Sequence, residues 1–514
     1  MLKKLYSAAV QGIDAQTVTI EVNCTQGIQF FMVGLPDAAV KESHHRIISA
    51  INQAGYKYPR RKTTVNLAPA DIKKEGTAYD LPIAMGILAA ADCIKSDGIE
   101  NFIIMGELSL DGTIRPIKGA LPITIKAKEE GFAGIILPRE NSPEAAIVQG
   151  IAVYGADNLK EVAGFFNNGC SGLERIETDL EEEFNKSDST YPFDFSEVKG
   201  QENVKRAVEV AAAGGHNIIM IGSPGSGKSM IAKRIPSILP PMTTEEALET
   251  TKVHSVAGIL GQNISLIRQR PFRSPHHTIS SAALVGGGTY PQPGEISLAH
   301  NGVLFLDELP EFSRHVLEVM RQPLEDRTIT ISRSKSSITY PAGIMLVASM
   351  NPCPCGYYNH PEKECICSEG AVAKYLGRIS GPLLDRIDIQ IEVVPVPFDR
   401  LADKKPGETS AVIRNRVISA RQRQTIRFAG EPGIHCNAQM TPGLIARYAT
   451  PDAEGMALLK NAMERFSLST RAYDRILKVA RTIADLAGHE EILPGDLREA
   501  ITYRNLDRST WGSR

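Results

Sequence analysis

The stretch NIIMIGSPGSGKS, at residues 217–229, constrains the fold of this chain more than any other feature. A short apolar, strand-like run leads directly into the pattern G-x-x-x-x-G-K-S. The backbone N–H groups of such a loop cradle phosphates, and the helix that follows presents its positive N-terminus to them. The sequence therefore predicts a P-loop α/β fold, the alternative being a chance match. The residues predicted to bind the nucleotide are Gly222, Ser223, Pro224, Gly225, Ser226, Gly227, Lys228 and Ser229.

A second motif, NGVLFLDE at residues 301–308, reads as a buried strand that ends in two acidic residues. We expect Asp307 to join Ser229 around magnesium, Lys228 to reach the β- and γ-phosphates, and Glu308 to polarise the attacking water. A merely solvated strand end is the alternative interpretation. Together the two motifs predict a nucleotide triphosphatase that uses ATP and magnesium.

Three further polar residues indicate the class of nucleotide triphosphatase. Asn351 ends another buried strand, GIMLVASMN, at the position where AAA+ ATPases place the residue that positions the water. Arg386, in GPLLDRIDI, lies where an arginine can reach the γ-phosphate of a neighbouring subunit. Arg471, in LSTRAYDR, lies in the helical region, where a second arginine can sense the γ-phosphate. Either arginine alone is most simply a surface or ion-paired residue, but their order after a nucleotide loop favours catalytic roles.

The pattern of segments predicts three domains joined by one linker. The first alternates strands and helices, including a helix that ends at Gly55 and a hairpin with the turn Asp111-Gly112. An acidic, polar segment follows, then a second α/β block, then a helical region with no convincing strand. The predicted parts are an N-terminal domain at residues 1–168, a linker at 169–190, an AAA+ core at 191–400 and a helical lid at 401–514.

The composition is that of an ordinary soluble protein. Of the 514 residues, 42% are hydrophobic and 23% charged, and no apolar run approaches the length of a membrane span. The N-terminus MLKKLYSAAVQGID has no apolar segment long enough for a signal peptide. We therefore expect a cytoplasmic protein without a membrane partner. The net charge of −2 leaves nucleic acid open as a partner, because the useful charge can be local.

Four of the eight cysteines lie within MNPCPCGYYNHPEKECICS, which begins at residue 350. Four thiolates can close a tetrahedral, structural zinc site, and a segment with so few apolar residues would gain its order from the metal. His360 could replace one sulfur, and reduced unliganded thiols or a redox role are the alternatives. The predicted zinc ligands are Cys353, Cys355, Cys365 and Cys367. The scattered remainder, Cys24, Cys93, Cys170 and Cys436, are interpreted as packing residues.

The chain resembles the magnesium-chelatase-like AAA+ proteins of the YifB/ComM family over essentially its whole length. The resemblance is carried by PFRSPHHTISSAALVGGG, SLAHNGVLFLDELPEF, MNPCPCGYY and SGPLLDRIDI. It implies a hexameric ATPase that binds DNA and drives branch migration during natural transformation or repair. The alternative is the motor subunit of a magnesium chelatase, which inserts a metal ion into a tetrapyrrole.

Two insertions in the AAA+ core are candidates for DNA contact. RTITISRSKSSITYPA reads as a hairpin with a basic tip at Arg333 and Lys335, and helicases of the related clade project such a hairpin into the central pore. The Gly-rich run ALVGGGTYPQPGE resembles a second pore insertion. Two plain surface hairpins are the alternative. The arginine-rich run from Ala411 is interpreted as a lid helix rather than a DNA site.

The N-terminal domain resembles the fold of Lon protease without its catalytic pair. The carrying segments are EGTAYDLPIAMGILAA and GELSLDGTIRPIKGA. Ala78 occupies the approximate place of the catalytic serine and Leu121 that of the lysine, so no nucleophile is available for acyl transfer. The resemblance therefore implies a scaffold for ring assembly or DNA binding, with YKYPRRK as a weak signal for DNA contact.

Overall fold

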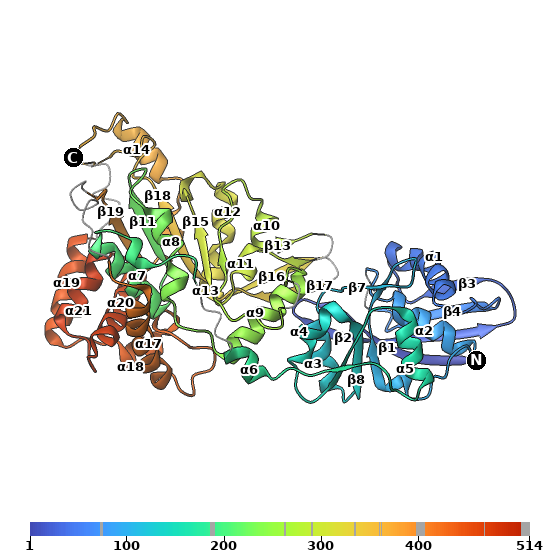
Figure 1. Cartoon of the computed structure of the whole chain (residues 1–514). Helices are drawn as coiled ribbons and strands as arrows, with labels where there is room; N and C mark the ends of the chain where they lie inside the picture. The colour runs from blue at the N-terminus through green and yellow to red at the C-terminus, as the bar shows by residue number, and fades with distance from the viewer. Residues whose placement is uncertain are drawn as a thin grey trace.

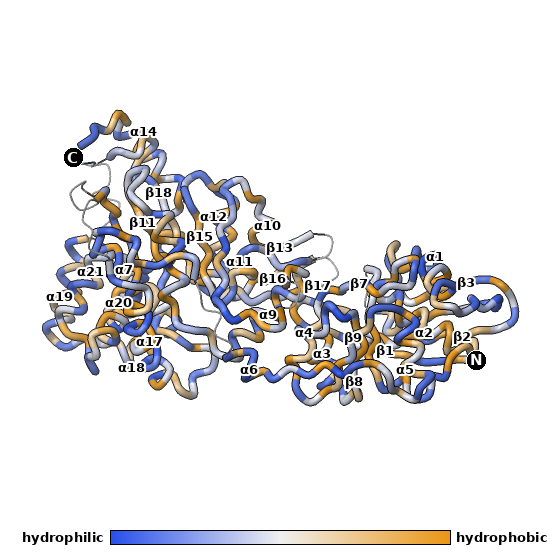
Figure 2. The backbone as a smooth tube through the Cα atoms, in the orientation of Figure 1, coloured by the Kyte–Doolittle hydropathy of each residue, from blue (hydrophilic) through white to orange (hydrophobic). Residues whose placement is uncertain are grey.

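The structure is a computed structural model, and it forms two lobes that lie side by side, an N-terminal lobe and an ATPase lobe that includes the lid (Figure 1). The described residues are 1–71, 74, 76–185, 191–261, 264–288, 291–333, 336–358, 360, 362–396, 407–466 and 468–504. Apolar stretches recur inside both lobes rather than gathering in one long segment (Figure 2). Among the described helices, none is long and apolar enough to cross a membrane.

The N-terminal lobe is built on an eight-stranded mixed sheet in the order β10-β9-β8-β5-β1-β2-β4-β3. Its strands are β1 (Leu2–Gln11), β2 (Asp14–Thr25), β3 (Phe30–Val33), β4 (Lys62–Ala68), β5 (Phe102–Ile104), β8 (Gly134–Pro138), β9 (Ala152–Ala156) and β10 (Arg175–Ile176). Its helices are α1 (Ala38–Gln53), α2 (Asp80–Ala90), α3 (Ala120–Glu129), α4 (Ser142–Ala146) and α5 (Leu159–Asn167). Helix α2 is buried along its whole length because it is apolar on every side.

The predicted local features of this lobe are confirmed. Helix α1 is capped by the Asp37 side chain, which accepts from the Val40 N–H at 2.8 Å, and it ends shortly before Gly55. The predicted hairpin is β6 (Glu107–Leu108) with β7 (Ile114–Arg115), and Gly112 supplies the positive φ of its turn. Both features were predictable because they depend on neighbours in the sequence.

The segment predicted as a linker carries structure of its own. Strand β10 pairs with β9, so the sheet of the N-terminal lobe extends beyond residue 168. Helix α6 (Leu180–Asn185) packs on the ATPase lobe, where the Ser265 hydroxyl donates to the Glu183 carboxylate at 2.8 Å. Helix α6 is therefore docked on the ATPase lobe although its sequence is acidic.

The ATPase core is a parallel sheet of five strands in the order β12-β15-β18-β11-β19. Its strands are β12 (Phe272–Arg273), β15 (Val303–Leu306), β18 (Met345–Met350), β11 (Ile218–Gly222) and β19 (Ile389–Val393). Its helices include α7 (Glu202–Gly214), α8 (Lys228–Ala232), α9 (Thr244–Ala257), α11 (Glu295–Leu298), α12 (Arg314–Val319), α13 (Arg321–Asp326), α14 (Glu369–Leu376) and α15 (Gly381–Leu384). Strands β15, β18 and β11 are adjacent and parallel, so their carboxyl ends meet at one edge.

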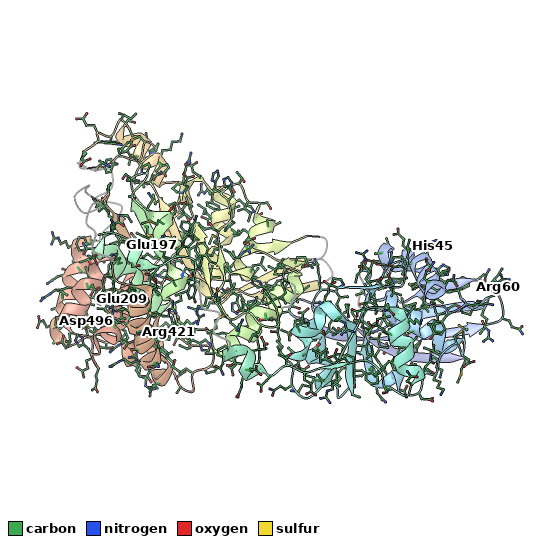
Figure 3. The ribbon with its side chains drawn as sticks, viewed as in Figure 1. His45, Arg60, Glu197, Glu209, Arg421 and Asp496 are labelled. Atoms are coloured by element: carbon green, nitrogen blue, oxygen red, sulfur yellow. The ribbon has the colours of Figure 1, made fainter. Side chains whose placement is uncertain are left out.

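The lid shares one apolar core with this sheet. Its helices are α17 (Ser410–Arg427), α18 (Pro442–Tyr448), α19 (Ala453–Phe466), α20 (Thr470–Ala487) and α21 (Pro494–Thr502). Val417 and Ile476 of the lid belong to the same buried cluster as Ile218 of the sheet. The arginines of α17 serve this packing: Arg421 donates to the carbonyl of Ala213 at 3.1 Å, and Figure 3 labels it close to Glu209, where lid and core meet.

Both predicted insertions are hairpins. The first consists of β16 (Thr328–Arg333) and β17 (Ser336–Pro341), and the second of β13 (Gly286–Gly287) and β14 (Gln292–Pro293) after helix α10 (Ser281–Val285). Strand β17 lies against the N-terminal lobe, where Ile338 approaches Gly12. The approach is so close that a Cβ placed on Gly12 would stand 2.9 Å from the Cγ2 of Ile338. A second contact between the lobes buries Leu121 among Met242, Ala247 and Leu266.

Candidate functional site

The phosphate loop connects β11 to α8 and holds Lys228 at its centre. Gly227 caps α8 with φ of 92°, a left-handed conformation that favours glycine. The Lys228 ammonium donates to the carbonyls of Gly222 and Ser223 at 2.6 and 2.9 Å, and to Oδ1 of Asn351 at 3.3 Å. The structure thus brings two of the predicted residues, Lys228 and Asn351, into direct contact.

Burial sets the acidity of this lysine. Removal from water lowers the pKa of Lys228 to about 8, although the carboxylates of Asp307 and Glu308 oppose the shift. Carbonyl and amide oxygens compensate only part of the lost hydration. The phosphates of a nucleotide would supply the missing negative charge.

The predicted magnesium ligands are also adjacent. The Ser229 hydroxyl donates to Oδ2 of Asp307 at 2.8 Å, and the Ser349 hydroxyl donates to Oδ1 of the same carboxylate. Two neighbouring ligands of an octahedral magnesium ion stand roughly 3 Å apart, since each lies about 2.1 Å from the ion. The two oxygens therefore fit a magnesium site.

Glu308 is held in a backbone conformation that is unusual for its residue type. Its φ is 53°. Its backbone N–H donates to the Ser349 hydroxyl, with 3.3 Å between the nitrogen and the oxygen. The carboxylate is exposed and lies 3.8 Å from Nδ1 of His277. Such backbone strain often marks a functional position. Neither Ser349 nor His277 was among the predicted site residues, although Ser349 lies in β18 two residues before Asn351, at the spacing that places side chains on the same face.

Arg386 is placed at the other end of the sheet. It is 4% exposed, its guanidinium pairs with Glu325 at 2.6 Å, and it donates to the carbonyl of Pro382 at 2.6 Å. The Asn217 side chain, just before β11, donates to the Arg386 carbonyl at 3.1 Å. Lys228 contacts Gly222 at the opposite end of that strand. The five residues of β11 place the two ends of the strand roughly 16 Å apart. Arg386 therefore does not meet the phosphate loop of its own chain, and its role across a subunit boundary stays a prediction.

Arg471 lies on the same side as Arg386. It is exposed in the first turn of α20. Burial alone would raise the pKa of Glu325, but the hydrogen bond from Arg386 and the charges of Arg471 and Arg475 lower it. A polar cavity of about 270 Å³ opens here between core and lid, lined by Glu325, Arg327 and Arg475 among others. The structure thus separates the predicted site residues into two groups, one at each edge of the sheet.

The lid is fixed at this edge by a buried ion pair. Arg475 donates to Asp388, which also accepts from the Asn217 N–H at 3.0 Å and lies 3.5 Å from Nδ1 of His216. Burial alone would raise the pKa of Asp388, but the positive charge of Arg475 and the contact with His216 hold it well below its usual range.

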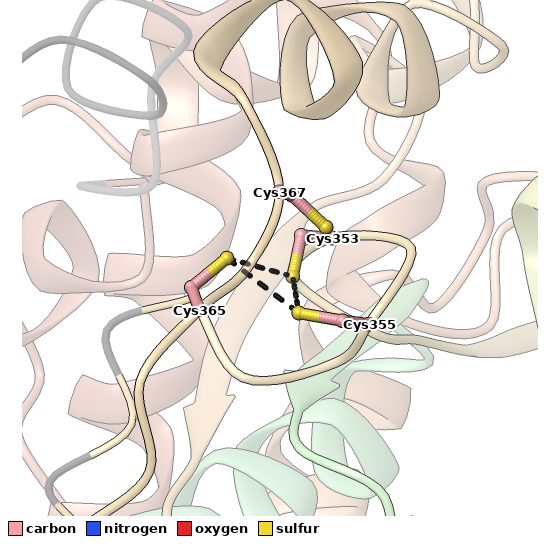
Figure 4. A group of neighbouring side chains, drawn as sticks. All are labelled: Cys353, Cys355, Cys365 and Cys367. Carbon is pink, nitrogen blue, oxygen red and sulfur yellow. Dashed lines mark hydrogen bonds between the residues drawn. The ribbon is translucent and has the colours of Figure 1, made fainter.

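The four clustered cysteines converge on one point (Figure 4). The sulfur of Cys353 lies 3.3 Å from that of Cys355 and 3.6 Å from that of Cys365, and all four sulfurs lie within 4.8 Å of one another. Every separation is far longer than a disulfide bond, and all eight cysteines are free. Sulfurs around tetrahedral zinc, each about 2.3 Å from the ion, stand roughly 3.8 Å apart. The donor set therefore fits zinc.

The acidities of these thiols also favour a cation. Burial alone would raise the pKa of Cys355, but hydrogen bonds from the Tyr357 backbone and from Cys353 lower it to about 6. Burial and the neighbouring thiols raise the pKa of Cys365 to about 12. A cation bound among the sulfurs would stabilise the thiolate form of its ligands. His360 is not part of the group: its Nδ1 accepts from the N–H groups of Glu362 and Lys363.

Two further predictions have different outcomes. The side chain of Arg333 and the whole of Lys335 lie outside the described residues, so their contact with DNA stays a prediction. At the place of the Lon pair, Ala78 accepts from the Gly106 N–H through its carbonyl at 2.9 Å, and Leu121 is buried between the lobes. Arg60, in the weak signal YKYPRRK, lies at the end of the N-terminal lobe away from the ATPase core (Figure 3).

Three family models match most of the chain. They are "Magnesium chelatase, subunit ChlI" at residues 194–401, "Subunit ChlI of Mg-chelatase" at 20–141 and "Magnesium chelatase, subunit ChlI C-terminal" at 407–504. Their order follows the ATPase core, the N-terminal lobe and the lid.

Comparison with individual proteins separates full-length relatives from partial ones. The chain is 42% identical to "Uncharacterized protein YifB" of Escherichia coli over 99% of this chain and 98% of the relative. It is 44% identical to "Competence protein ComM" of Haemophilus influenzae over 98% and 97%. A "Magnesium-chelatase 38 kDa subunit" of Rhodobacter capsulatus is 25% identical over 45% of this chain and 69% of the subunit. The chain therefore belongs to the magnesium-chelatase-related AAA+ ATPases, in the group that contains YifB and ComM.

Proposed function

We propose that this protein assembles into a hexameric ring that hydrolyses ATP to drive branch migration of DNA in recombination or natural transformation. The observation that carries the proposal is the full-length identity of 44% with a protein named for competence. The ATPase geometry described above supplies the motor. We expect it to act in the cytoplasm.

Each residue of the phosphate site has a role in hydrolysis. Lys228 binds the β- and γ-phosphates, Ser229 and Asp307 hold magnesium, and Glu308 accepts the proton of the attacking water. Magnesium, when bound, neutralises charge on the phosphates. Asn351, already in contact with Lys228, orients the water at the γ-phosphate.

The remaining half of the site comes from a neighbouring subunit. Arg386 and Arg471 lie at the opposite edge of the sheet from Lys228, and both act electrostatically on Glu325. In a ring, that edge of one subunit faces the phosphate loop of the next. An arginine supplied across such a boundary stabilises the charge of the transition state.

The two hairpins are our candidates for DNA contact. β16–β17 and β13–β14 extend from the ATPase core, and the predicted basic tip of the first suits phosphate groups. Their movement with nucleotide state would transmit force to the strand. The contact of Ile338 with the turn at Gly12 gives the N-terminal lobe a route to sense that movement.

A magnesium-chelatase motor is the second candidate. It is favoured by the descriptions of all three matching family models. The chelatase subunits, however, match the chain at 24–25% identity over less than half its length.

The leading proposal also includes a structural zinc ion at the four cysteines, supported by the separation and acidity of their sulfurs.

The test is ATP hydrolysis with and without a synthetic branched DNA. We expect branched DNA to stimulate hydrolysis and the labelled branch to move. Glu308→Gln is the control, because it keeps the binding site but loses the base, about 10²–10⁴-fold in rate. If no DNA stimulates hydrolysis or shows branch movement, the chelatase motor becomes the leading function.

A further inference from the structure

The cysteine cluster lies directly against the phosphate loop. Gly356 follows the first cysteine pair, with φ of 84°, and its N–H donates to the carbonyl of Cys353 at 3.0 Å. A Cβ placed on Gly356 would stand 2.4 Å from Cδ and 2.7 Å from Cγ of Pro224. Pro224 belongs to the phosphate loop itself. The turn of the first cysteine pair therefore packs on that loop with no room for a side chain.

The same segment also holds Asn351. This residue accepts from Lys228 at 3.3 Å, and Met350 just before it packs in the same buried cluster as Tyr375 of α14. Cys353 follows two residues later and is fully buried. The segment thus leaves β18 at the nucleotide site, passes through the cysteine cluster and returns to the site at α14.

Apolar packing contributes little order to this segment. Its one large aliphatic side chain, Ile366 between Cys365 and Cys367, is 89% exposed. The sulfurs themselves are the contacts that join the residues around Cys353 to those around Cys365. A segment of this kind takes its folded geometry from the metal that its ligands bind.

We propose that the four-cysteine cluster is a metal-dependent brace for the phosphate loop, that is, a metal site that holds this loop in position. A divalent ion that prefers sulfur ligands, which we take to be zinc, fixes the turn at Gly356 against Pro224 and thereby sets the affinity for ATP. The inference rests on the zinc site of the proposed function but not on DNA or ring formation. Metal occupancy then changes the affinity for the nucleotide as well as the stability of the segment.

The first experiment measures zinc content and ATP affinity of the full chain, purified under reducing conditions with zinc and without DNA. We expect one zinc per chain in the parent protein. Cys365→Ser should lose the zinc and weaken ATP binding about tenfold. This factor is the lower end of the loss in metal affinity or activity that mutations around a metal site typically cause. Cys93→Ser, an exposed cysteine outside the cluster, is the matched control and should change neither. No bound zinc in the parent protein, or full ATP affinity in zinc-free Cys365→Ser, overturns the proposal.

A second variant tests the brace with all four thiols in place. Gly356→Ala should still bind zinc but weaken ATP binding about tenfold, because the new Cβ pushes on the phosphate loop. Gly430→Ala is the control: Gly430 has φ of 93° and open space around it, so it bears the same backbone strain without the contact. Parent-like ATP affinity in Gly356→Ala would refute the coupling even if Cys365→Ser fails to fold. A failure of DNA stimulation leaves these measurements unaffected.

Discussion

The lowered pKa of Lys228 predicts that ATP binding weakens as the pH rises above 8. In the free protein burial lowers this pKa to about 8, whereas bound phosphates favour the charged ammonium and raise it. Above pH 8 the lysine must therefore take up a proton when ATP binds. Between pH 7 and pH 9.5 the dissociation constant should rise about thirtyfold, equivalent to about 2 kcal/mol, provided that the bound lysine stays protonated.

The assay is titration with a fluorescent ATP analogue at low temperature, where hydrolysis by the Glu308→Gln variant is negligible. Lys228→Arg is the informative comparison, because a guanidinium stays charged throughout this range. Its affinity should be weaker at pH 7 but nearly independent of pH, whereas Lys228→Ala should not bind. A rise of less than about threefold in the Glu308→Gln protein with Lys228 intact would show that Lys228 is not the group that titrates.

The other predictions concern the opposite edge of the sheet. Arg386→Ala and Lys228→Ala should each abolish turnover, but a mixture of the two should recover part of it, because some interfaces then pair an intact Lys228 with an intact Arg386. Recovery is measured as ATPase rate against mixing ratio, and its absence would contradict a shared site. Asp388→Asn should reduce the free energy of unfolding by about 3 kcal/mol, since it leaves Arg475 without its buried partner. Because folding lowers the pKa of Asp388, its contribution to the free energy of unfolding is complete above the unfolded pKa near 4 and is lost as the pH falls through the folded pKa. The free energies of unfolding from urea titrations at pH 7 and pH 3 should therefore differ less in the variant than in the parent.

The phosphate site was predictable from the sequence because its parts are local motifs at the ends of parallel strands. Lys228, Asp307 and Asn351 each follow an apolar run, and adjacency of those strands brings them together at one edge. The cysteine cluster was predictable for a similar reason, since four thiols in so short a segment can meet without any contact from a distant part of the chain.

Contacts between distant segments were not predictable. Nothing near Glu325 in the sequence indicates that it pairs with Arg386, and nothing near Gly356 indicates that it packs on Pro224. Such contacts depend on how loops pack across the folded domain, which periodicity and capping do not specify. The sequence left an ion pair open for Arg386, but it indicated neither the partner Glu325 nor the burial of the guanidinium.

That burial leads to a last prediction about when the enzyme is active. In the proposed shared site, Lys228 and Arg386 of a single chain lie at opposite edges of the sheet, and Glu325 already occupies the guanidinium of Arg386. Contact with the next subunit must therefore offer Arg386 a stronger anion than Glu325, and the γ-phosphate of a bound nucleotide is such a group. Specific ATPase activity should then rise with protein concentration, while ATP binding, which uses Lys228, should not. Glu325→Gln should raise the activity at low concentration, because the neutral amide holds the arginine less tightly. The rate is measured across a dilution series alongside sedimentation, and constant specific activity in samples that sediment as single chains would refute the requirement for a neighbour.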